Sequence, residues 1–424
     1  MTKKLAIVGG GPKAAALVSR AAVLRDMGVA NVPDLLVFEK KAVGSAWSGD
    51  GGYSSGHLTL CSPAEKDVGF PYVEFSAENG EQSIASALHA RFSWSAYLVA
   101  TGSFSEWVDR GRDHPTHGIW ADYLKWVFVK ADQGIVPGEV IKVKSQSGGG
   151  WHITYVDDKD EVTTEVDGVV LTGTGEAKVI SGLTSNIPTE RLLNAETFWR
   201  HRNQVRKWNE IAVTGAGGAA GAIVAWLSNA LAEESDATIR SISPMGTLFL
   251  RGDGYAERRW FTDPDAWTDL SLGDRRRLLE RTEAGVISSR NKSIIDSACN
   301  VDYVLGKAIN ASWDDSELTI NITYDGQNQK QVTADCLINA IGFDAWSLLK
   351  LVDAVAVRSI LDPTNKKIRE QLEGEILPDL SFPVSAGLGT GLHVPSLAAL
   401  AHGPGMATLG SLGLLASAIL KSYL

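Results

Sequence analysis

The sequence predicts an α/β fold with two parallel β-sheets, because one local pattern occurs twice. Two glycine-rich turns, residues 9–14 (GGGPKA) and 215–220 (GAGGAA), each follow a short apolar run, residues 5–8 and 211–214. Such runs predict buried parallel strands, and the alanines after each turn predict a helix start. Strand, glycine turn and helix in this order form a Rossmann-like dinucleotide-binding unit. We therefore expect two such domains.

The glycine turns have the residue types that a pyrophosphate requires. The first glycine permits the sharp turn, the second lets the backbone approach phosphate, and alanine in the third place lets the helix pack on the strand. Free N–H groups at the helix start then face the phosphate. The expected contacts are Gly9, Gly11, Pro12 and Ala14 in the first turn and Gly215, Gly217, Gly218 and Ala220 in the second. One such turn alone is weak evidence, because any tight turn before a packed helix can use the same glycines.

An acidic residue ends the second predicted strand of the first unit. The run 35–38 (LLVF) is followed by Glu39, which is where such a strand presents a carboxylate to ribose hydroxyls. The block from 38 to 47 resembles the FAD-binding half of flavoprotein monooxygenases. We therefore assign FAD to the first turn, with Glu39, Lys40 and Trp47 as further contacts. For Glu39 alone, a solvated charge at a strand end is the alternative.

The second unit has no carboxylate at the corresponding place. Its strand 238–242 ends at Ser243, while Arg240 and Arg251 are nearby in the sequence. Absence of an acid relaxes the discrimination against a 2′-phosphate, which favours NADPH over NADH. Ser243 and Arg251 are the expected contacts, although either arginine could be a surface charge only.

Composition limits the possible partners. The chain has 424 residues, a net charge of −10 and a pI near 5.4, which argues against nucleic acid or an anionic membrane as partner. Three scattered cysteines without a CxxC pair, and histidines without ligand spacing, predict no metal site and a reducing, cytoplasmic location. The nearly apolar segment 403–420 is expected to be a buried helix, since glycines interrupt it and it is barely long enough to span a membrane.

The order of the motifs predicts a discontinuous first domain. Residues 1–205 and 334–424 are expected to form the FAD domain, and residues 206–333 an inserted NADPH domain with a substrate region at about 253–300. The segment 145–150 is predicted to be a hairpin tip. A close backbone turn at 172–175 and a related one at 336–343 are expected near a cofactor.

Several longer stretches carry a resemblance that is more specific than the glycine turns. The chain resembles the class B flavin N-hydroxylases of siderophore biosynthesis, the lysine and ornithine N-monooxygenases, and among them the mycobactin-type lysine N6-hydroxylases. The resemblance covers nearly the whole chain. Its most specific stretches are residues 22–29, 65–72, 104–112, 242–249, 251–252, 261–264, 403–405 and 412–415.

The resemblance implies a reaction. NADPH would reduce FAD, O₂ would add at the flavin C4a position, and the hydroperoxide would deliver one oxygen atom to a neutral terminal amine. No protein acid, base or nucleophile is then needed, because the cofactor carries the chemistry. L-Lysine is the first-choice substrate, and ornithine or a diamine is the alternative. A flavoprotein-like binding protein without catalysis is the alternative from another class. The resemblance also implies a small helical substrate-binding region beside the two dinucleotide-binding domains, and a homo-oligomer, a dimer or tetramer.

Residue roles follow from the same resemblance. Lys66 aligns with the lysine that binds the substrate α-carboxylate in the ornithine enzymes. Arg258 stands where those enzymes have a substrate-binding asparagine, and Ile287 lies near the place of their second asparagine. Both departures leave the choice of amine open. Further FAD contacts are implied at Cys61, where the ornithine enzymes have a glutamine, at Gly342 and at Leu409.

Overall fold

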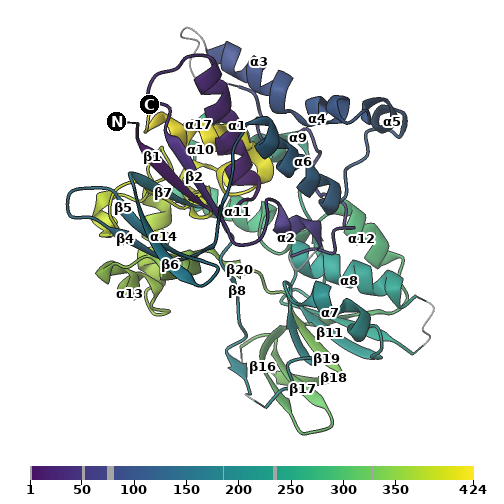
Figure 1. Ribbon diagram of the computed structural model, residues 1–424. Helices are drawn as coiled ribbons and strands as arrows, with labels where there is room; N and C mark the ends of the chain where they lie inside the picture. Colours follow the sequence, from purple (N-terminus) through teal and green to yellow (C-terminus); the bar gives the residue numbers. More distant parts are fainter. Residues whose placement is uncertain (1, 50–52, 74–80, 185, 233–235, 327–328) are drawn as a thin grey trace.

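The computed structural model describes residues 2–49, 53–73, 81–184, 186–232, 236–326 and 329–424. Within these residues the chain forms two α/β units, each built on a five-stranded parallel sheet. The unit that holds both termini lies at the upper left of Figure 1, and the second unit lies below it to the right. The predicted fold class is confirmed.

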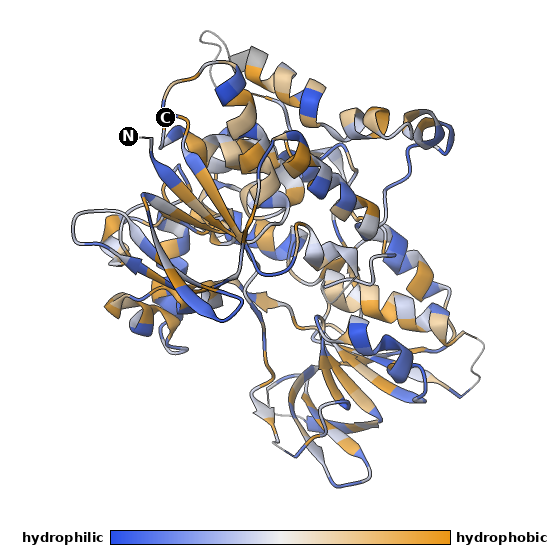
Figure 2. Ribbon diagram, viewed as in Figure 1, coloured by the Kyte–Doolittle hydropathy of each residue, from blue (hydrophilic) through white to orange (hydrophobic). Residues whose placement is uncertain are grey.

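The first sheet surrounds the first glycine turn. Its strand order is β21 (Leu392–His393), β7 (Gly168–Leu171), β1 (Lys4–Val8), β2 (Asp34–Glu39) and β3 (Val136–Pro137), all parallel. The middle residues of the central strands are apolar and mostly buried (Figure 2), as expected for a sheet covered on both faces. Helix α1 (Pro12–Asp26) packs against the C-terminal helix α17 (Leu412–Lys421) and α6 (His117–Lys130).

The second sheet has the order β10 (Leu192–Asn194), β19 (Cys336–Asn339), β11 (Glu210–Thr214), β12 (Thr238–Ser243) and β15 (Val301–Leu305), again all parallel. Helices α7 (Phe198–Val205), α8 (Gly218–Ala230) and α12 (Ser289–Asp296) belong to this unit. Strands β10 and β19 lie outside the range 206–333 that the sequence suggested. The second sheet therefore begins before residue 206 and continues past residue 333, because β19 is the direct partner of β11.

Antiparallel sheets extend both units. Strands β4 (Glu139–Ser145), β5 (Trp151–Asp157) and β6 (Asp160–Val166) form one of them, and the β4–β5 connection confirms the predicted hairpin tip at 145–150. The second unit carries β16 (Lys307–Trp313), β17 (Leu318–Thr323) and β18 (Gln329–Ala334), with β9 (Gly182–Leu183) at the edge.

The chain passes between the units along a two-stranded ribbon of β8 (Glu176–Ala177) and β20 (Phe343–Asp344). Gly175 precedes β8 with φ +81°, and a side chain on it would collide with the carbonyl of Asp344. A glycine is required there because two backbones approach so closely.

Short helices fill the remaining space. Between the strand pair β13 (Phe249–Leu250) and β14 (Val286–Ile287) these are α9 (Tyr255–Arg259), α10 (Pro264–Thr268) and α11 (Leu272–Thr282). This agrees with the small helical region expected at about 253–300. Elsewhere the elements are α2 (Ser45–Ser48), α3 (Glu81–Phe92), α4 (Trp94–Ala100), α5 (Phe104–Asp109), η1 (Ala345–Leu351), α13 (Val355–Leu361), α14 (Lys366–Glu375), η2 (Val384–Ala386), η3 (Pro395–Leu397), α15 (Ala399–His402), α16 (Pro404–Ala407) and η4 (Leu409–Ser411).

The apolar C-terminal segment is a packed part of the first unit. Most of α17 is buried, and the predicted buried helix is thus confirmed for the second half of 403–420, while the first half forms the short elements α16 and η4. Among the described residues, no helix is long and apolar enough to cross a membrane.

Candidate functional site

The first glycine turn leaves an open space beside the start of α1. Gly9 has φ +104°, donates to the Phe38 carbonyl at 2.8 Å, and has Thr172 Oγ1 2.6 Å from where its Cβ would be. Gly11 caps α1, and a Cβ on it would meet no atom of the described residues within 4 Å, its chain neighbours aside. Pro12 begins the helix, where its missing N–H costs nothing. The backbone at the start of α1 therefore faces unoccupied space, which fits the pyrophosphate of a dinucleotide.

Glu39 is turned toward this glycine turn. Its Oε2 accepts from the Gly10 amide at 2.8 Å, and its Oε1 accepts from the Lys41 amide at 2.9 Å. A carboxylate can accept further hydrogen bonds, so these contacts position Glu39 and still leave capacity for ribose hydroxyls. Lys40, in contrast, pairs with Glu139 at 2.8 Å on the surface.

The other residues expected near FAD lie in different surroundings. Trp47 packs edge-on against His117, with ring centroids 4.8 Å apart. Ala14 is fully buried, as the packing role in the turn requires. Gly342 has φ +100° and open space at its Cβ, whereas Cys61 is exposed and Leu409 is half-buried.

Lys13 is a buried lysine that was not predicted from the sequence to have a functional role. Its Nζ donates to Ser396 Oγ at 2.6 Å, and Ser396 Oγ donates to the Gly173 carbonyl at 2.7 Å. Burial lowers the pKa of Lys13 to about 7. The residue joins the first helical turn of α1 to the close turn at 172–175. Its only signal in the sequence was a lysine inside an otherwise apolar helix start.

The second glycine turn repeats the geometry of the first. Gly215 has φ +130° and donates to the Ile242 carbonyl at 3.0 Å; a side chain on it would collide with the Ala340 carbonyl. Gly217 caps α8, and a Cβ on Gly217 or Gly218 would meet no atom of the described residues within 4 Å beyond the chain neighbours. Ala220 is buried against the sheet. This turn too has the open backbone that a pyrophosphate needs.

Ser243 and the two arginines near it have partners of their own. Ser243 is fully buried, and its hydroxyl donates to the Thr247 carbonyl at 2.9 Å and accepts from the Thr247 amide at 3.1 Å. Arg240 pairs with Glu210. Arg251 faces Glu283, with Nη2 and Oε2 3.6 Å apart. The structure thus ties Ser243 to its own turn and places Arg251 in a charged cluster with Lys66.

That cluster joins three segments that are distant in sequence. We call Lys66, Arg251, Asp253, Arg258 and Glu283 the Lys66 cluster. The charges of the other four act on Lys66, and Arg258 pairs with Asp253 at 3.2 Å. Two of its members, Lys66 and Arg258, were predicted from the sequence to bind the substrate, and the structure brings them together.

Lys66 itself is more than a solvated surface charge. Its ammonium lies over the rings of Phe70 and Phe261, 5.7 and 5.6 Å from their centroids. Burial, followed by the charge of Arg258, lowers its pKa. Within the described part of the chain no carboxylate oxygen lies within 4 Å of its ammonium, because Asp253 pairs with Arg258 and Glu283 faces Arg251.

Ile287 lies elsewhere. Its side chain is 1% exposed and packs against Gly221 of α8 in the core of the second unit. Only its backbone reaches the Lys66 cluster, since its carbonyl accepts from the Arg251 amide at 2.8 Å. The position that corresponds to the second asparagine therefore offers no side chain to a ligand here.

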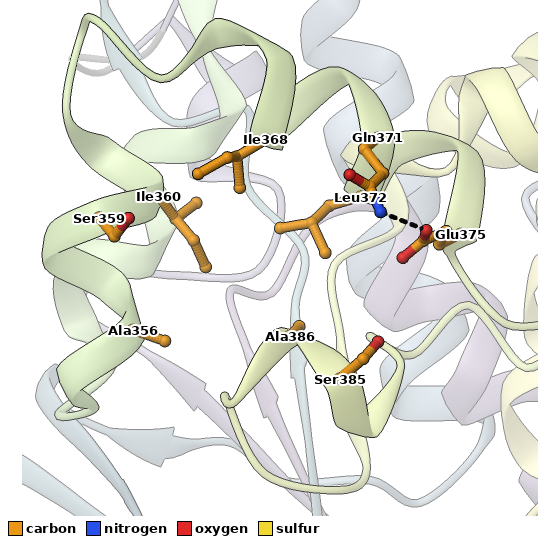
Figure 3. Close-up of a pocket in the computed structure, with 9 residues that line it drawn as sticks. All are labelled: Ala356, Ser359, Ile360, Ile368, Gln371, Leu372, Glu375, Ser385 and Ala386. Atoms are coloured by element: carbon orange, nitrogen blue, oxygen red, sulfur yellow. Dashed lines mark hydrogen bonds between the residues drawn. The ribbon is translucent and has the colours of Figure 1, made fainter.

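A separate hollow of about 250 Å³ lies between α13, α14 and η2 (Figure 3). It is lined by Ile360, Leu372 and their neighbours, and at one side of it Gln371 donates to Glu375 of the same helix α14 at 2.8 Å. None of the expected cofactor or substrate residues lines it. Among the described residues there is also no group of three or more His, Cys, Asp or Glu side chains placed to hold a metal ion.

The chain has two parallel sheets, each with an unobstructed glycine turn, and the half-buried Lys66 cluster. These features are typical of the two-dinucleotide flavoprotein class. The family model for L-lysine 6-monooxygenase/L-ornithine 5-monooxygenase matches residues 88–305. L-lysine N6-monooxygenase MbtG of Mycobacterium sp. (strain MCS) is 35% identical over 431 residues, covering 100% of this chain and 96% of the relative. The chain therefore belongs to the L-lysine 6-monooxygenase/L-ornithine 5-monooxygenase family, which confirms the resemblance seen in the sequence.

Further relatives agree with this assignment. MbtG of Mycobacterium tuberculosis (strain ATCC 25618 / H37Rv) is 32% identical over 424 residues, with 99% and 95% of the two chains covered. Among solved structures, lysine monooxygenase NbtG from Nocardia farcinica is similar with a TM-score of 0.80, 30% identity and coverage of 98% and 99%. The Kutzneria sp. 744 ornithine N-hydroxylase KtzI shares the fold, with a TM-score of 0.75 at 17% identity and coverage of 100% and 99%.

Proposed function

We propose that this protein is an FAD- and NADPH-dependent monooxygenase that hydroxylates the N6 amine of L-lysine, in siderophore-type or related biosynthesis. Family membership supports the reaction type, and the named relatives include lysine monooxygenases. The observation that carries the substrate proposal is Lys66, a half-buried ammonium with aromatic neighbours and, among the described residues, no carboxylate oxygen within 4 Å. We expect a dimer or tetramer, which light scattering can measure.

We place FAD in the first unit and NADPH in the second. Gly9, Gly11 and Glu39 would hold the FAD pyrophosphate and ribose, and Gly215, Gly217 and Gly218 would hold the NADPH pyrophosphate. The reduced flavin supplies the oxygen chemistry when bound. The FAD domain would then follow the first sheet and the NADPH domain the second, so that β10 and β19 belong to the NADPH domain.

The chain's own residues bind and orient the amine. Lys66 would hold the α-carboxylate, which fixes one end of the substrate and directs the distal amine away from it. The rings of Phe70 and Phe261 exclude water from that ammonium and so strengthen its attraction for a carboxylate. The amine must be uncharged to act as a nucleophile, and a desolvated site lowers its pKa toward that form.

Replacing Lys66 by alanine tests the carboxylate role. We expect the KM for lysine to rise about tenfold or more, since a charge-assisted hydrogen bond contributes ~1.5–3 kcal/mol. NADPH-driven flavin reduction without substrate should stay near that of the wild type. The measurement is hydroxylamine formation over lysine, ornithine, putrescine and cadaverine, with Lys366→Ala, an exposed lysine on α14, as control.

Arg258→Asn restores the residue of the ornithine enzymes and should change the preference between amines with and without a carboxylate. If Lys66→Ala and Arg258→Asn both match the wild type over the whole panel, the substrate site lies elsewhere. A wild-type protein that forms hydroxylamine faster from a diamine than from lysine would instead favour the diamine alternative. A protein that forms none from any amine would favour the binding-protein alternative.

Gly217→Val tests the placement of NADPH. The backbone has φ −90° at this position and no close neighbour, so valine should be accommodated by the protein itself. We expect the variant to stay yellow while the KM for NADPH rises about tenfold or more, because the branched side chain occupies the pyrophosphate space. Loss of FAD with normal NADPH reduction of the residual flavin would show that the two sites are exchanged.

A further inference from the structure

Glu283 carries a buried carboxylate oxygen that has no hydrogen-bond partner in the part of the chain that the structure describes. The residue ends α11, with its amide donating to the Leu279 carbonyl at 2.9 Å, and its side chain is only 20% exposed. Oε2 lies 3.6 Å from Arg251, but Oε1 is shielded from solvent and has no hydrogen bond from any described residue. Buried carboxylate oxygens are normally satisfied, since leaving one unpaired costs stability. Glu283 Oε1 therefore has the capacity to accept a hydrogen bond from a ligand.

The surroundings of Glu283 show which donor fits. Its charge and that of Lys66 act on each other, so both belong to one small region. Burial, the largest effect, raises the pKa of Glu283 above its usual value, and the charges of Arg251 and Lys66 oppose part of that rise. Two cations beside the carboxylate favour its ionised form, which accepts hydrogen bonds only. In its ionised form, a carboxylate with one unpartnered oxygen and a cation 3.6 Å from the other matches a ligand that carries an ammonium and a carboxylate on neighbouring atoms.

We propose that Glu283 Oε1 accepts a hydrogen bond from the α-ammonium group of the substrate, so that Lys66 and Glu283 together recognise a zwitterionic α-amino acid. This inference rests on the proposed N-hydroxylase function and specifies its substrate class. It assigns Glu283 the role of a specificity residue, beside the carboxylate role proposed for Lys66.

The distal amine is excluded as the partner of Glu283 by the chemistry of the reaction. A carboxylate stabilises the charged form of an amine beside it, whereas the reacting amine must be neutral. The α-ammonium does not react and can remain charged. The Lys66 cluster also has three cations against two carboxylates, so a diamine, which has a second ammonium and no carboxylate, is disfavoured there.

Three ligands that differ by one group test the proposal on the FAD-loaded protein. L-Lysine has both the α-carboxylate and the α-ammonium, 6-aminohexanoate lacks the α-ammonium, and cadaverine lacks the carboxylate. Calorimetry gives the Kd for each, and hydroxylamine formation gives KM and kcat. We expect the wild type to bind lysine about tenfold or more tightly than 6-aminohexanoate.

Glu283→Gln keeps the size of the side chain and removes its charge. The Kd and KM for lysine should rise about tenfold, with kcat changed by less than about twofold, while 6-aminohexanoate binds as it does to the wild type. The ratio between the two ligands should therefore fall toward one. Glu280→Gln on the same helix α11, where the side chain is exposed, is the matched control and should keep the wild-type ratio.

An unchanged ratio in Glu283→Gln would overturn the proposal. If that variant does not retain FAD, the two Kd values of the wild-type protein test the proposal. Equal binding of lysine and 6-aminohexanoate would show that the α-ammonium makes no favourable contact. If the wild type forms no hydroxylamine from lysine, the proposed function fails, yet the two Kd values still test Glu283. A wild type that binds no lysine at all contradicts both.

Discussion

Gly11→Val is expected to yield a folded protein without flavin. Gly11 has φ −91° at the N-cap of α1, an extended conformation that valine adopts readily, and its Cβ position is empty of described protein atoms beyond the chain neighbours. The protein should therefore tolerate the change. The branched side chain would instead fill the space that we assign to the FAD pyrophosphate, and we expect FAD binding to weaken by about a hundredfold or more, ~2.7 kcal/mol.

The measurement is the flavin content of the purified variant by absorbance, with circular dichroism to check the fold. Gly217→Val is the matched control, because it places the same side chain on the equivalent helix cap of the second unit and should leave flavin content unchanged. A full complement of FAD in Gly11→Val would refute the assignment of FAD to the first turn.

Asp67→Ala is expected to cause the largest loss of stability. Asp67 is 2% exposed and accepts three hydrogen bonds, from the Tyr72 hydroxyl at 2.6 Å, the Trp94 amide at 2.7 Å and the Gly69 amide at 3.1 Å. Alanine would leave these donors unpaired at a buried site, which costs about 3 kcal/mol or more. The segment that carries Lys66 would also lose its anchor, so the KM for the amine should rise as well.

Calorimetric unfolding of the FAD-loaded protein measures this loss. Asp122→Ala, which removes an exposed carboxylate on α6, should stay within about 0.5 kcal/mol of the wild type. An Asp67→Ala protein as stable as that control would show that the three hydrogen bonds contribute little.

Asp67 should also make stability depend on pH. Burial raises its pKa to about 7, against the hydrogen bonds that lower it, while an unfolded aspartate titrates near pH ~4. Between these values the folded protein holds more protons than the unfolded chain, so this group's contribution to stability decreases as pH rises from about 4 to 7 and is constant above. The difference in unfolding free energy between the wild type and Asp67→Asn should follow that course.

The features that the sequence determined are local ones. The strand, turn and helix of each nucleotide-binding unit lie within about twenty consecutive residues, and their apolar runs and glycines specify them without reference to the rest of the chain. The geometry at Gly9 and Gly215, both with φ above +100°, agrees with what these positions predicted. The β4–β5 hairpin and the buried C-terminal helix were predicted for the same reason.

Only the tertiary structure decided which distant residues meet. Strand β10 has three residues, too few for a periodic signal, and its place in the second sheet depends on pairing with β19, about 140 residues later. The unsatisfied oxygen of Glu283, the buried ammonium of Lys13 and the core position of Ile287 likewise depend on how separate segments pack. From sequence alone, a charged side chain is expected to be exposed to water. Only the segments that fold around it determine whether it is buried, and a buried charge then requires a partner.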